Sequence, residues 1–242
     1  MGECSEYTLN KPCETGFIAI GDMARKLNGR LSSIEALHEV ESNITDATQV
    51  NGYAFVVVLA DATNAENLTE AKRLMELFWE AEILVYPVLI TEEDLSMDHP
   101  VFQINPTEFQ DIADMQNVIL ESIQGFTDMV CSEAMVSLEL DDVKELFDGQ
   151  GCLSFVQSMA SGKEGCATAA KDAADKIKNK LSADSVIVVN IVGNEHLGMM
   201  ELMESTNAMC DELGSDDMFL MWGARIDKDL KDTVKVLLWA RG

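Results

Sequence analysis

Apolar runs and stretches with helical spacing alternate along most of the chain. Two clear apolar runs, Tyr53–Ala60 (YAFVVVLA) and Ile83–Ile90 (ILVYPVLI), are rich in β-branched residues, as is typical of strands buried on both faces of a parallel sheet. Between them, Asn64–Glu82 has its apolar residues at helical spacing. A strand, a helix and a strand in succession predict a βαβ unit with a right-handed crossover.

The alternation continues on both sides of this unit. Upstream, Phe17–Ile20 predicts a short strand, and Leu27–Val40 predicts a helix capped by Ser32 or Ser33. Downstream, the pattern predicts strands at Val101–Ile104, Cys152–Met159, Ser185–Ile191, Met218–Trp222 and Val234–Trp239, and helices at Phe109–Val130, Asp141–Phe147, Cys166–Leu181 and Leu197–Leu213. We therefore expect an α/β fold with a hinge near residue 131, although the pattern does not determine the order of the strands.

The charge of the chain narrows the range of partners. Its 242 residues include 43 acidic and 17 basic side chains, which give a formal net charge of −26. A negative field of this size repels phosphate backbones and anionic membrane surfaces, so we expect no nucleic-acid partner. The apolar runs are strand-sized and far shorter than the ~20 residues that span a bilayer, so we also expect no membrane insertion.

The first residues and the cysteines favour a cytoplasmic protein. The chain does not start with a charged segment followed by an apolar run, as a signal peptide would. Its six cysteines show no CxxC or other tight spacing, so we expect thiols rather than a disulfide framework, and no metal site at Cys4 and Cys13.

From about Asp114 to its end, the chain follows a recognisable order of segments. These are DMQNVILESIQGFTDMV (114–130), MVSLELDDVKELF (135–147), GKEGCATAA (162–170), VIVVNIVGNEHLGMMEL (186–202), FLMWGARID (219–227) and VKVLLWARG (234–242). In order and spacing they resemble the central helix, the acidic loop and the C-terminal strands and helices of the FtsZ branch of the tubulin superfamily. Tyr53–Ile90 resembles, more weakly, that family's strand, phosphate loop, helix and next strand.

This resemblance implies a fold in three parts. We expect a reduced Rossmann-like, GTPase-type domain over residues 1–110, a long central linking helix over residues 111–131, and a C-terminal α/β sandwich domain of the tubulin/FtsZ type over residues 132–242. The part ahead of Tyr53 is about half as long as in the family, so the nucleotide-binding half looks shortened at its N-terminus.

The segment that resembles the family's phosphate loop has lost its glycines. The family holds the phosphates of GTP on a turn of the type GGGTGSG, where backbone N–H groups converge on the phosphate oxygens. The matching residues here are Asp61, Ala62, Thr63, Asn64, Ala65, Glu66 and Asn67, and no glycine occurs from Tyr53 to Gln124. The carboxylates of Asp61 and Glu66 would repel a triphosphate. Alternatively, Asp61, Thr63 and Asn64 simply end a strand and cap a helix. We therefore expect no nucleotide cofactor held in the family's way at this place.

The acidic loop of the family is better kept. In the family, this loop follows the central helix, and its acids position water against the GTP of the next subunit. The resemblance carries these acids to Glu139 and Asp142, with Ser137 where the family usually has Asn, and Glu139 is one methylene longer than the usual Asp. Carboxylates suit this task because they can orient and partly deprotonate a water molecule. Asp141 and Asp142 also stand at a predicted helix start, where acids stabilise the helix dipole.

Two other groups of residues give weaker signals. His38, His99 and His196 are scattered and pair with no Ser or Cys in a recognisable catalytic motif. Methionines on the helix predicted over Leu197–Leu213 are either core filler or a methionine-lined face for a partner.

These signals leave three functions open. The leading one is an FtsZ-like protein, a degenerate GTPase, that has lost GTP binding and acts by protein–protein contact in cytoskeletal filament assembly or its regulation, of the cell-division type. Its partner would be a second copy or an FtsZ-type homologue, with no cofactor and no metal. The alternatives are a divergent polymerising GTPase that binds GTP and Mg²⁺ by other loops, and a stand-alone ligand-binding module.

Overall fold

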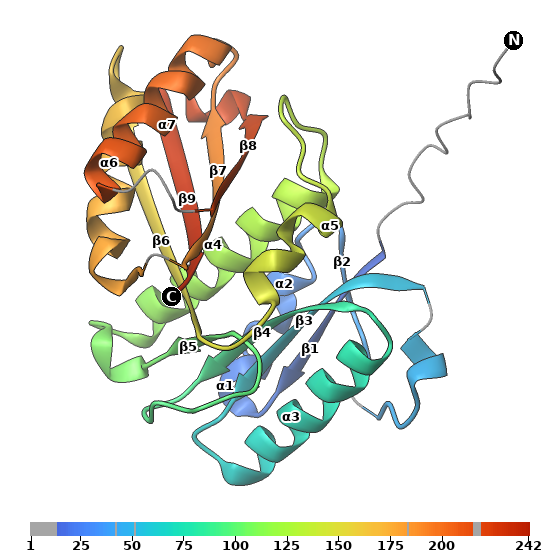
Figure 1. Ribbon diagram of the computed structural model, residues 1–242. Coiled ribbons are helices and arrows are strands. Elements are labelled where there is room, and N and C mark those ends of the chain that lie inside the picture. Colours follow the sequence, from blue (N-terminus) through green and yellow to red (C-terminus); the bar gives the residue numbers. More distant parts are fainter. Residues whose placement is uncertain (1–13, 42, 51, 183, 215–218) are drawn as a thin grey trace, which may run out of the picture.

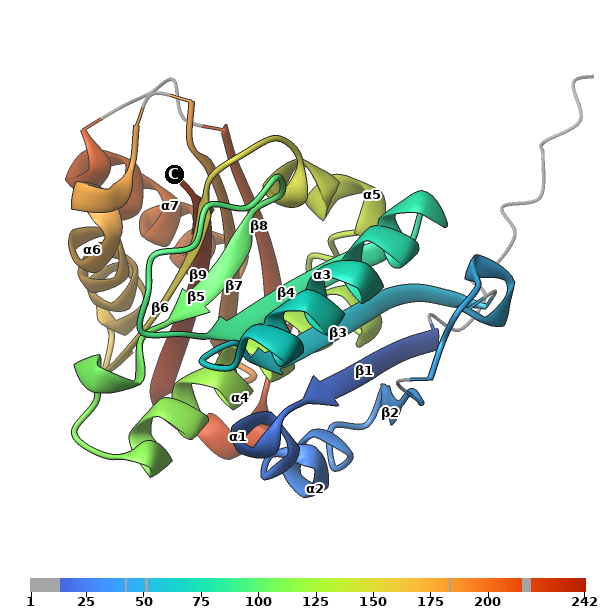
Figure 2. The ribbon, with the colours of Figure 1, turned by 90° about the horizontal axis from the view of Figure 1, so that it is seen from below.

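A computed structural model describes residues 14–41, 43–50, 52–182, 184–214 and 219–242. The nine strands in these residues form one sheet in the order β2-β1-β3-β4-β5-β6-β9-β7-β8 (Figures 1 and 2). Neighbouring strands are parallel, except that β9 is antiparallel to both β6 and β7. The mixed α/β fold expected from the sequence is confirmed, with a mostly parallel sheet.

The first half of the chain supplies five strands and the long helix α4. The elements are β1 (Glu14–Ile20), α1 (Asp22–Arg25), α2 (Asn28–Leu31), β2 (Leu37–Glu39), η1 (Ala47–Val50), β3 (Tyr53–Asp61), α3 (Ala65–Glu80), β4 (Leu84–Ile90), β5 (Val101–Ile104), η2 (Pro106–Glu108) and α4 (Ile112–Cys131). The βαβ unit predicted over Tyr53–Ile90 is therefore confirmed as β3, α3 and β4.

The second half supplies the other four strands. Its elements are α5 (Leu140–Val143), η3 (Lys144–Phe147), β6 (Cys152–Ser161), α6 (Gly165–Ile177), η4 (Lys178–Lys180), β7 (Val186–Gly193), α7 (Met199–Leu213), β8 (Phe219–Ile226), η5 (Lys228–Leu230) and β9 (Thr233–Arg241). Each predicted element of this half is present. Met218, with which the strand over Met218–Trp222 was predicted to begin, lies outside the described residues.

The helix predicted over Leu27–Val40 is wrong. Only Asn28–Leu31 is helical, and Leu37–Glu39 forms the edge strand β2, which pairs with Thr15–Phe17 of β1. Asn28, Gly29 and the two serines that follow Leu31 have low helix propensity, so the local sequence cannot sustain a longer helix. Pairing with β1 then satisfies the backbone groups that a helix would have satisfied.

Helices cover both faces of the sheet. Alternate residues of β3 show this: Phe55, Val57 and Leu59 belong to the same core as α4, whereas Val56 and Val58 pack in the core of α3. The α4 core continues through β7 and β9, while α6 and α7 cover the other face of those two strands. In Figure 1, α4 lies in the middle of the molecule, between the strands β1–β4 on one side and β7–β9 on the other. The division into domains at residues 110 and 131 stays a prediction.

The backbone of α4 comes very close to the sheet at Gly125. A Cβ added there would lie 2.5 Å from Cδ1 of Leu237 and 3.2 Å from the ring of Trp239, both on β9. The buried side chain of Asn190 on β7 donates a hydrogen bond to the Gly125 carbonyl at 3.1 Å. Glycine suits this close approach, because an added Cβ would force the Leu237 side chain to move within a filled core.

An aromatic cluster forms around the next residue, Phe126. Its ring centroid lies 5.4 Å from that of Phe55, 5.2 Å from Tyr86, 5.5 Å from Phe147 and 5.6 Å from Trp239. The indole Nε1 of Trp239 donates to the buried hydroxyl of Tyr86 at 3.1 Å. Because Tyr86 lies on β4 and Trp239 on β9, the cluster joins both halves of the sheet under α4.

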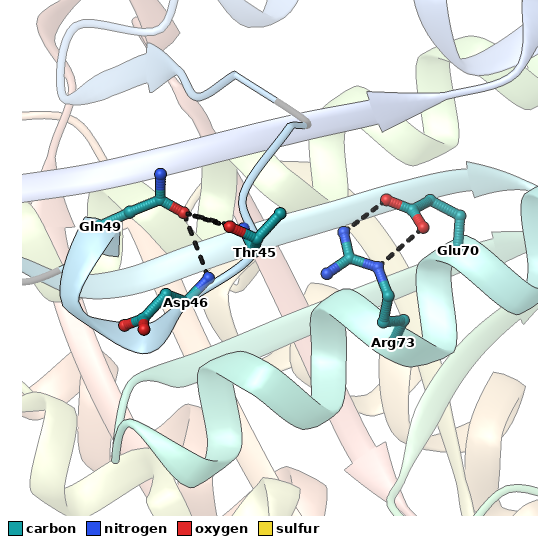
Figure 3. A network of polar contacts seen from close by, with 5 residues as sticks. All are labelled: Thr45, Asp46, Gln49, Glu70 and Arg73. Atoms are coloured by element: carbon teal, nitrogen blue, oxygen red, sulfur yellow. Dashed lines mark hydrogen bonds and ion pairs between the residues drawn. The ribbon is translucent and has the colours of Figure 1, made fainter.

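Polar contacts at the surface contribute less to stability than the buried aromatic cluster does. Figure 3 shows Arg73 of α3 donating two hydrogen bonds to Glu70, at 2.9 and 2.6 Å, and the Gln49 side chain of η1 accepting from the backbone N–H groups of Thr45 and Asp46. The Arg73 guanidinium lowers the pKa of Glu70. Both side chains are more than a third exposed, so the pair is worth only about 0.2–1 kcal/mol. Burial of apolar side chains in the three cores contributes more to stability than this exposed pair.

Replacing Gly125 with alanine tests the close approach of α4. The added Cβ would overlap Leu237 in a filled core, so we expect the free energy of unfolding to fall by about 1–3 kcal/mol. Gly29→Ala in α2 is the matched control, because a Cβ there meets nothing within 4 Å and alanine favours a helix by up to about 1 kcal/mol. Urea unfolding followed by circular dichroism measures both, and equal effects would contradict the close approach.

Candidate functional site

The loop after β3 lies at a switch point of the sheet. β1 and β3 are adjacent and parallel, but the helices that follow them go to opposite faces. α1 and α2 share the core of α4, whereas α3 packs in the core on the other face. Ligands of open α/β sheets bind at the carboxyl ends of two such strands. The topology therefore indicates the same place as the resemblance to the phosphate loop.

The Asp61 carboxylate is already engaged at this place. Asp61 is the last residue of β3 and is only 8% exposed. Its Oδ1 accepts a hydrogen bond from Thr63 Oγ1 at 2.6 Å, and its Oδ2 accepts from the backbone N–H of Met23 at 3.4 Å. Met23 is in the first turn of α1, where free N–H groups would otherwise point toward an anionic ligand.

Asn67 fills the space on the other side of Asp61. Its Nδ2 donates to the Asp61 carbonyl at 2.9 Å. Gly21, which precedes α1, has a φ of 84°, and a Cβ added there would lie 2.4 Å from Asn67 Nδ2 and 2.8 Å from Asp61 Cβ. The side chains of Asp61 and Asn67 therefore lie close to Gly21, at the ends of β1 and β3.

Asn64 and Glu66 of the same segment lie at the start of α3. The Asn64 side chain accepts a hydrogen bond from the Glu66 N–H at 2.8 Å, so Asn64 is the N-cap of α3. Glu66 is exposed in the first turn, where its charge favours the helix dipole. Both residues have a structural role that explains their presence.

The acidic loop takes an extended course after α4. Val136 pairs with Ala224 of β8 through two backbone hydrogen bonds of 3.1 and 3.0 Å, and Leu138 packs against the α4 core. Ser137 and Glu139 alternate with these residues and are exposed. The loop is thus fixed to the sheet by every second residue and presents Ser137 and Glu139 to solvent.

Asp142 has a capping role at the start of α5. Its Oδ2 accepts a hydrogen bond from the backbone N–H of Glu139 at 2.8 Å. Asp141, its neighbour, forms an exposed ion pair with Lys144. The structure therefore brings Ser137, Glu139 and Asp142 together on one short surface segment, but Asp142 also holds the helix in place.

An ion pair lies beside this segment, at the end of α4. Arg225 of β8 and Asp128 of α4 are 3.1 Å apart, and both are largely shielded from solvent. Burial raises the pKa of Asp128, and the positive charge of Arg225 opposes that shift. The pair joins the last turn of α4 to the strand that holds Val136.

The two candidate regions lie at opposite ends of the strands, one at the carboxyl ends and the other at the amino ends. Asp61 ends β3 at the carboxyl edge, whereas Phe147, just after α5, shares a cavity with Ile83 and Leu84 at the amino end of β4. Figures 1 and 2 show α5 and the start of α3 at opposite ends of the sheet. One molecule cannot bring Glu139 and the loop after β3 together, so any chemistry between them needs two molecules.

The methionines of α7 divide between the core and the surface. Met209 is buried against α6, whereas Met199, Met200 and Met203 are 55%, 66% and 55% exposed. The start of α7 therefore has a methionine-lined face.

The cysteines, possible metal ligands and possible membrane helices can be assessed only within the described residues. Cys4 and Cys13 lie outside the described residues, and no disulfide joins the four cysteines within them. Those residues also contain no group of three or more His, Cys, Asp or Glu placed to hold a metal ion. Among the described helices, none combines the length and the apolar character needed to cross a membrane.

Comparisons with known proteins agree with this arrangement. Residues 151–242 match the FtsZ family, C-terminal domain. The structure of an empty FtsZ dimer from M. jannaschii, 13% identical, matches 98% of this chain and 90% of its own, with a TM-score of 0.74. A mutant FtsZ from the same organism is 12% identical. It matches 95% of this chain and 91% of its own, with a TM-score of 0.68. TubZ of Clostridium botulinum phage c-st is 9% identical. It matches 93% of this chain and 92% of its own, with a TM-score of 0.54.

The chain has the fold of the tubulin/FtsZ superfamily. Within that superfamily, its residues 151–242 are of the FtsZ C-terminal type. The resemblance inferred from the segments after Asp114 is therefore confirmed.

Asp142→Ala tests the capping role of this acid. The substitution removes the acceptor of the Glu139 N–H, so we expect the free energy of unfolding to fall by about 0.5–2 kcal/mol. We also expect faster amide exchange at the start of α5, measured by hydrogen–deuterium exchange. Asp141→Ala removes an equal charge from an exposed ion pair and should change neither quantity. If it destabilises α5 as much as Asp142→Ala, the capping role is wrong.

Proposed function

We propose that this chain has lost the GTP binding of the superfamily and acts by protein–protein contact in cytoskeletal filament assembly or its regulation. One observation carries the first part: the side chains of Asp61 and Asn67 occupy the switch point between β1 and β3. The Asp61 carboxylate already accepts from the first turn of α1. A phosphate group would have to displace a residue that is 8% exposed and hydrogen-bonded on both oxygens.

Electrostatics add to this steric argument. Two like charges about 4 Å apart repel by roughly 4 kcal/mol at an effective dielectric constant near 20. A triphosphate at the loop after β3 would face Asp61 and Glu66 without any glycine N–H groups to compensate. The cost exceeds what one helix N-terminus returns, about 0.3–1 kcal/mol at exposed sites.

The acidic loop supports the second part of the proposal. In the family, filaments grow head to tail, so the acidic loop of one subunit meets the nucleotide face of the next, and such a contact is heterologous. This chain presents Ser137 and Glu139 to solvent at one edge, while its opposite edge is closed by its own side chains. A molecule with one working edge would act as a cap: it docks on the nucleotide face of a GTP-bound homologue and offers the next subunit nothing.

A polymerisation assay with a nucleotide-binding homologue from the same cell tests capping. Substoichiometric wild-type protein should shorten the filaments, measured by electron microscopy and light scattering. Glu139→Gln keeps the size of the side chain and removes the charge, so we expect a weaker effect on length. Asp142 is left unchanged because it caps α5.

Asp141→Asn is the control for the filament assay. It removes the same charge two residues away without touching Glu139, so it should shorten filaments as the wild type does. If none of the three proteins changes filament length, or if all three act equally, Glu139 is not part of the working surface.

A further inference from the structure

A stacked pair of rings lies at the end of α3, at the amino ends of the strands, where the segment after α5 also lies. The ring centroids of Trp79 and His99 are 3.8 Å apart, and their planes are inclined by 34°. Trp79 is in the last turns of α3, and His99 is at the end of the connection between β4 and β5. Both side chains are half-buried, so each leaves part of its ring accessible.

Two hollows share this pair as a common wall. One, of about 210 Å³, is also lined by Lys72 and Glu76 of α3 and by Asp98. The other, of about 470 Å³, is also lined by Glu82, Lys144 and Asp148. We call the two hollows together the Trp–His groove. It runs from α3 to η3, along the amino end of β4.

The walls of the groove are fixed before any partner binds. The connection between β4 and β5 is fastened to β5, because Gln103 accepts from the Leu95 N–H at 2.8 Å and donates to the Leu95 carbonyl at 2.7 Å. Leu95 and Met97 pack against the α3 core. A preformed groove loses little entropy when it is filled.

The rim of the groove has an excess of negative charge. Glu76, Glu82, Asp98 and Asp148 line it, and none of them forms an ion pair within the described residues. Of the two lysines, Lys144 is already paired with Asp141. The carboxylates favour a positively charged occupant, and the Trp79 and His99 rings favour one with a flat face that can stack on them.

We propose that the Trp–His groove binds arginine side chains of a partner protein. A guanidinium group is planar, stacks on Trp and His rings and donates hydrogen bonds to carboxylates on either side. A second copy of this chain fits poorly, because its own net charge of −26 would be brought against the same acidic rim. The proposal does not depend on loss of GTP binding or on filament capping.

Binding of short fluorescent peptides, measured by anisotropy at physiological salt, tests this proposal. The probe carries two arginines separated by glycines, and two matched probes carry citrulline or lysine instead. Citrulline keeps the planar shape without the charge, and lysine keeps the charge without the plane. We expect the arginine probe to bind at least tenfold more tightly than the citrulline probe and several-fold more tightly than the lysine probe.

Two double variants separate the groove from the general charge of the chain. Glu82→Gln with Asp98→Asn should weaken binding of the arginine probe at least tenfold. Glu41→Gln with Glu133→Gln changes the net charge equally at exposed positions outside the groove, and should weaken binding less than twofold. Thermal unfolding checks that both variants are folded. Equal weakening by the two double variants, or equal binding of the arginine and lysine probes, would overturn the proposal.

Discussion

The close approach of α4 to the sheet at Gly125 is the contact on which the rest of the structure depends. Because no side chain separates the helix from Leu237 and Trp239, Phe126 can reach aromatic residues of both β4 and β9. One helix therefore buries one face of a sheet assembled from both halves of the chain. The direction of α4 also determines where its C-terminus emerges, beside β8, where Val136 pairs with Ala224. The position of the acidic loop thus follows from packing that lies in the core.

The two ends of the strands, the carboxyl ends and the amino ends, differ in how their polar side chains are used. At the carboxyl edge, Asp61 and Asn67 lie against Gly21, and the Asp61 carboxylate accepts a hydrogen bond from the Met23 N–H of α1. At the opposite edge, the loop after α4 is anchored by its apolar residues, and its polar residues remain available. A superfamily member with both edges open would form a head-to-tail contact at each. The arrangement here is consistent with a protein that uses one edge only, which is the basis of the proposed function.

Much of the fold could be predicted from the sequence, because buried strands and amphipathic helices leave strong periodic signals. Tyr53–Ala60, Val101–Ile104 and the long helix after Phe109 are examples. The region from Leu27 to Val40 was misjudged because its apolar spacing fits a helix, while pairing with β1, a tertiary interaction, decides the outcome. The absence of glycine after β3 was visible in the sequence. The contacts of Gly21 with Asn67, and of Trp79 with His99, join distant residues, and no local pattern announces them.

The central claim is that the chain's own side chains close the phosphate position. Titration calorimetry of the purified protein with GTP and Mg²⁺ tests it most directly, with a nucleotide-binding FtsZ titrated under the same conditions as the positive control. We expect no heat of binding from this protein at concentrations at which the control saturates. A dissociation constant below ~10 μM, or about −7 kcal/mol, would contradict the account and would favour a divergent GTPase that binds nucleotide by other loops.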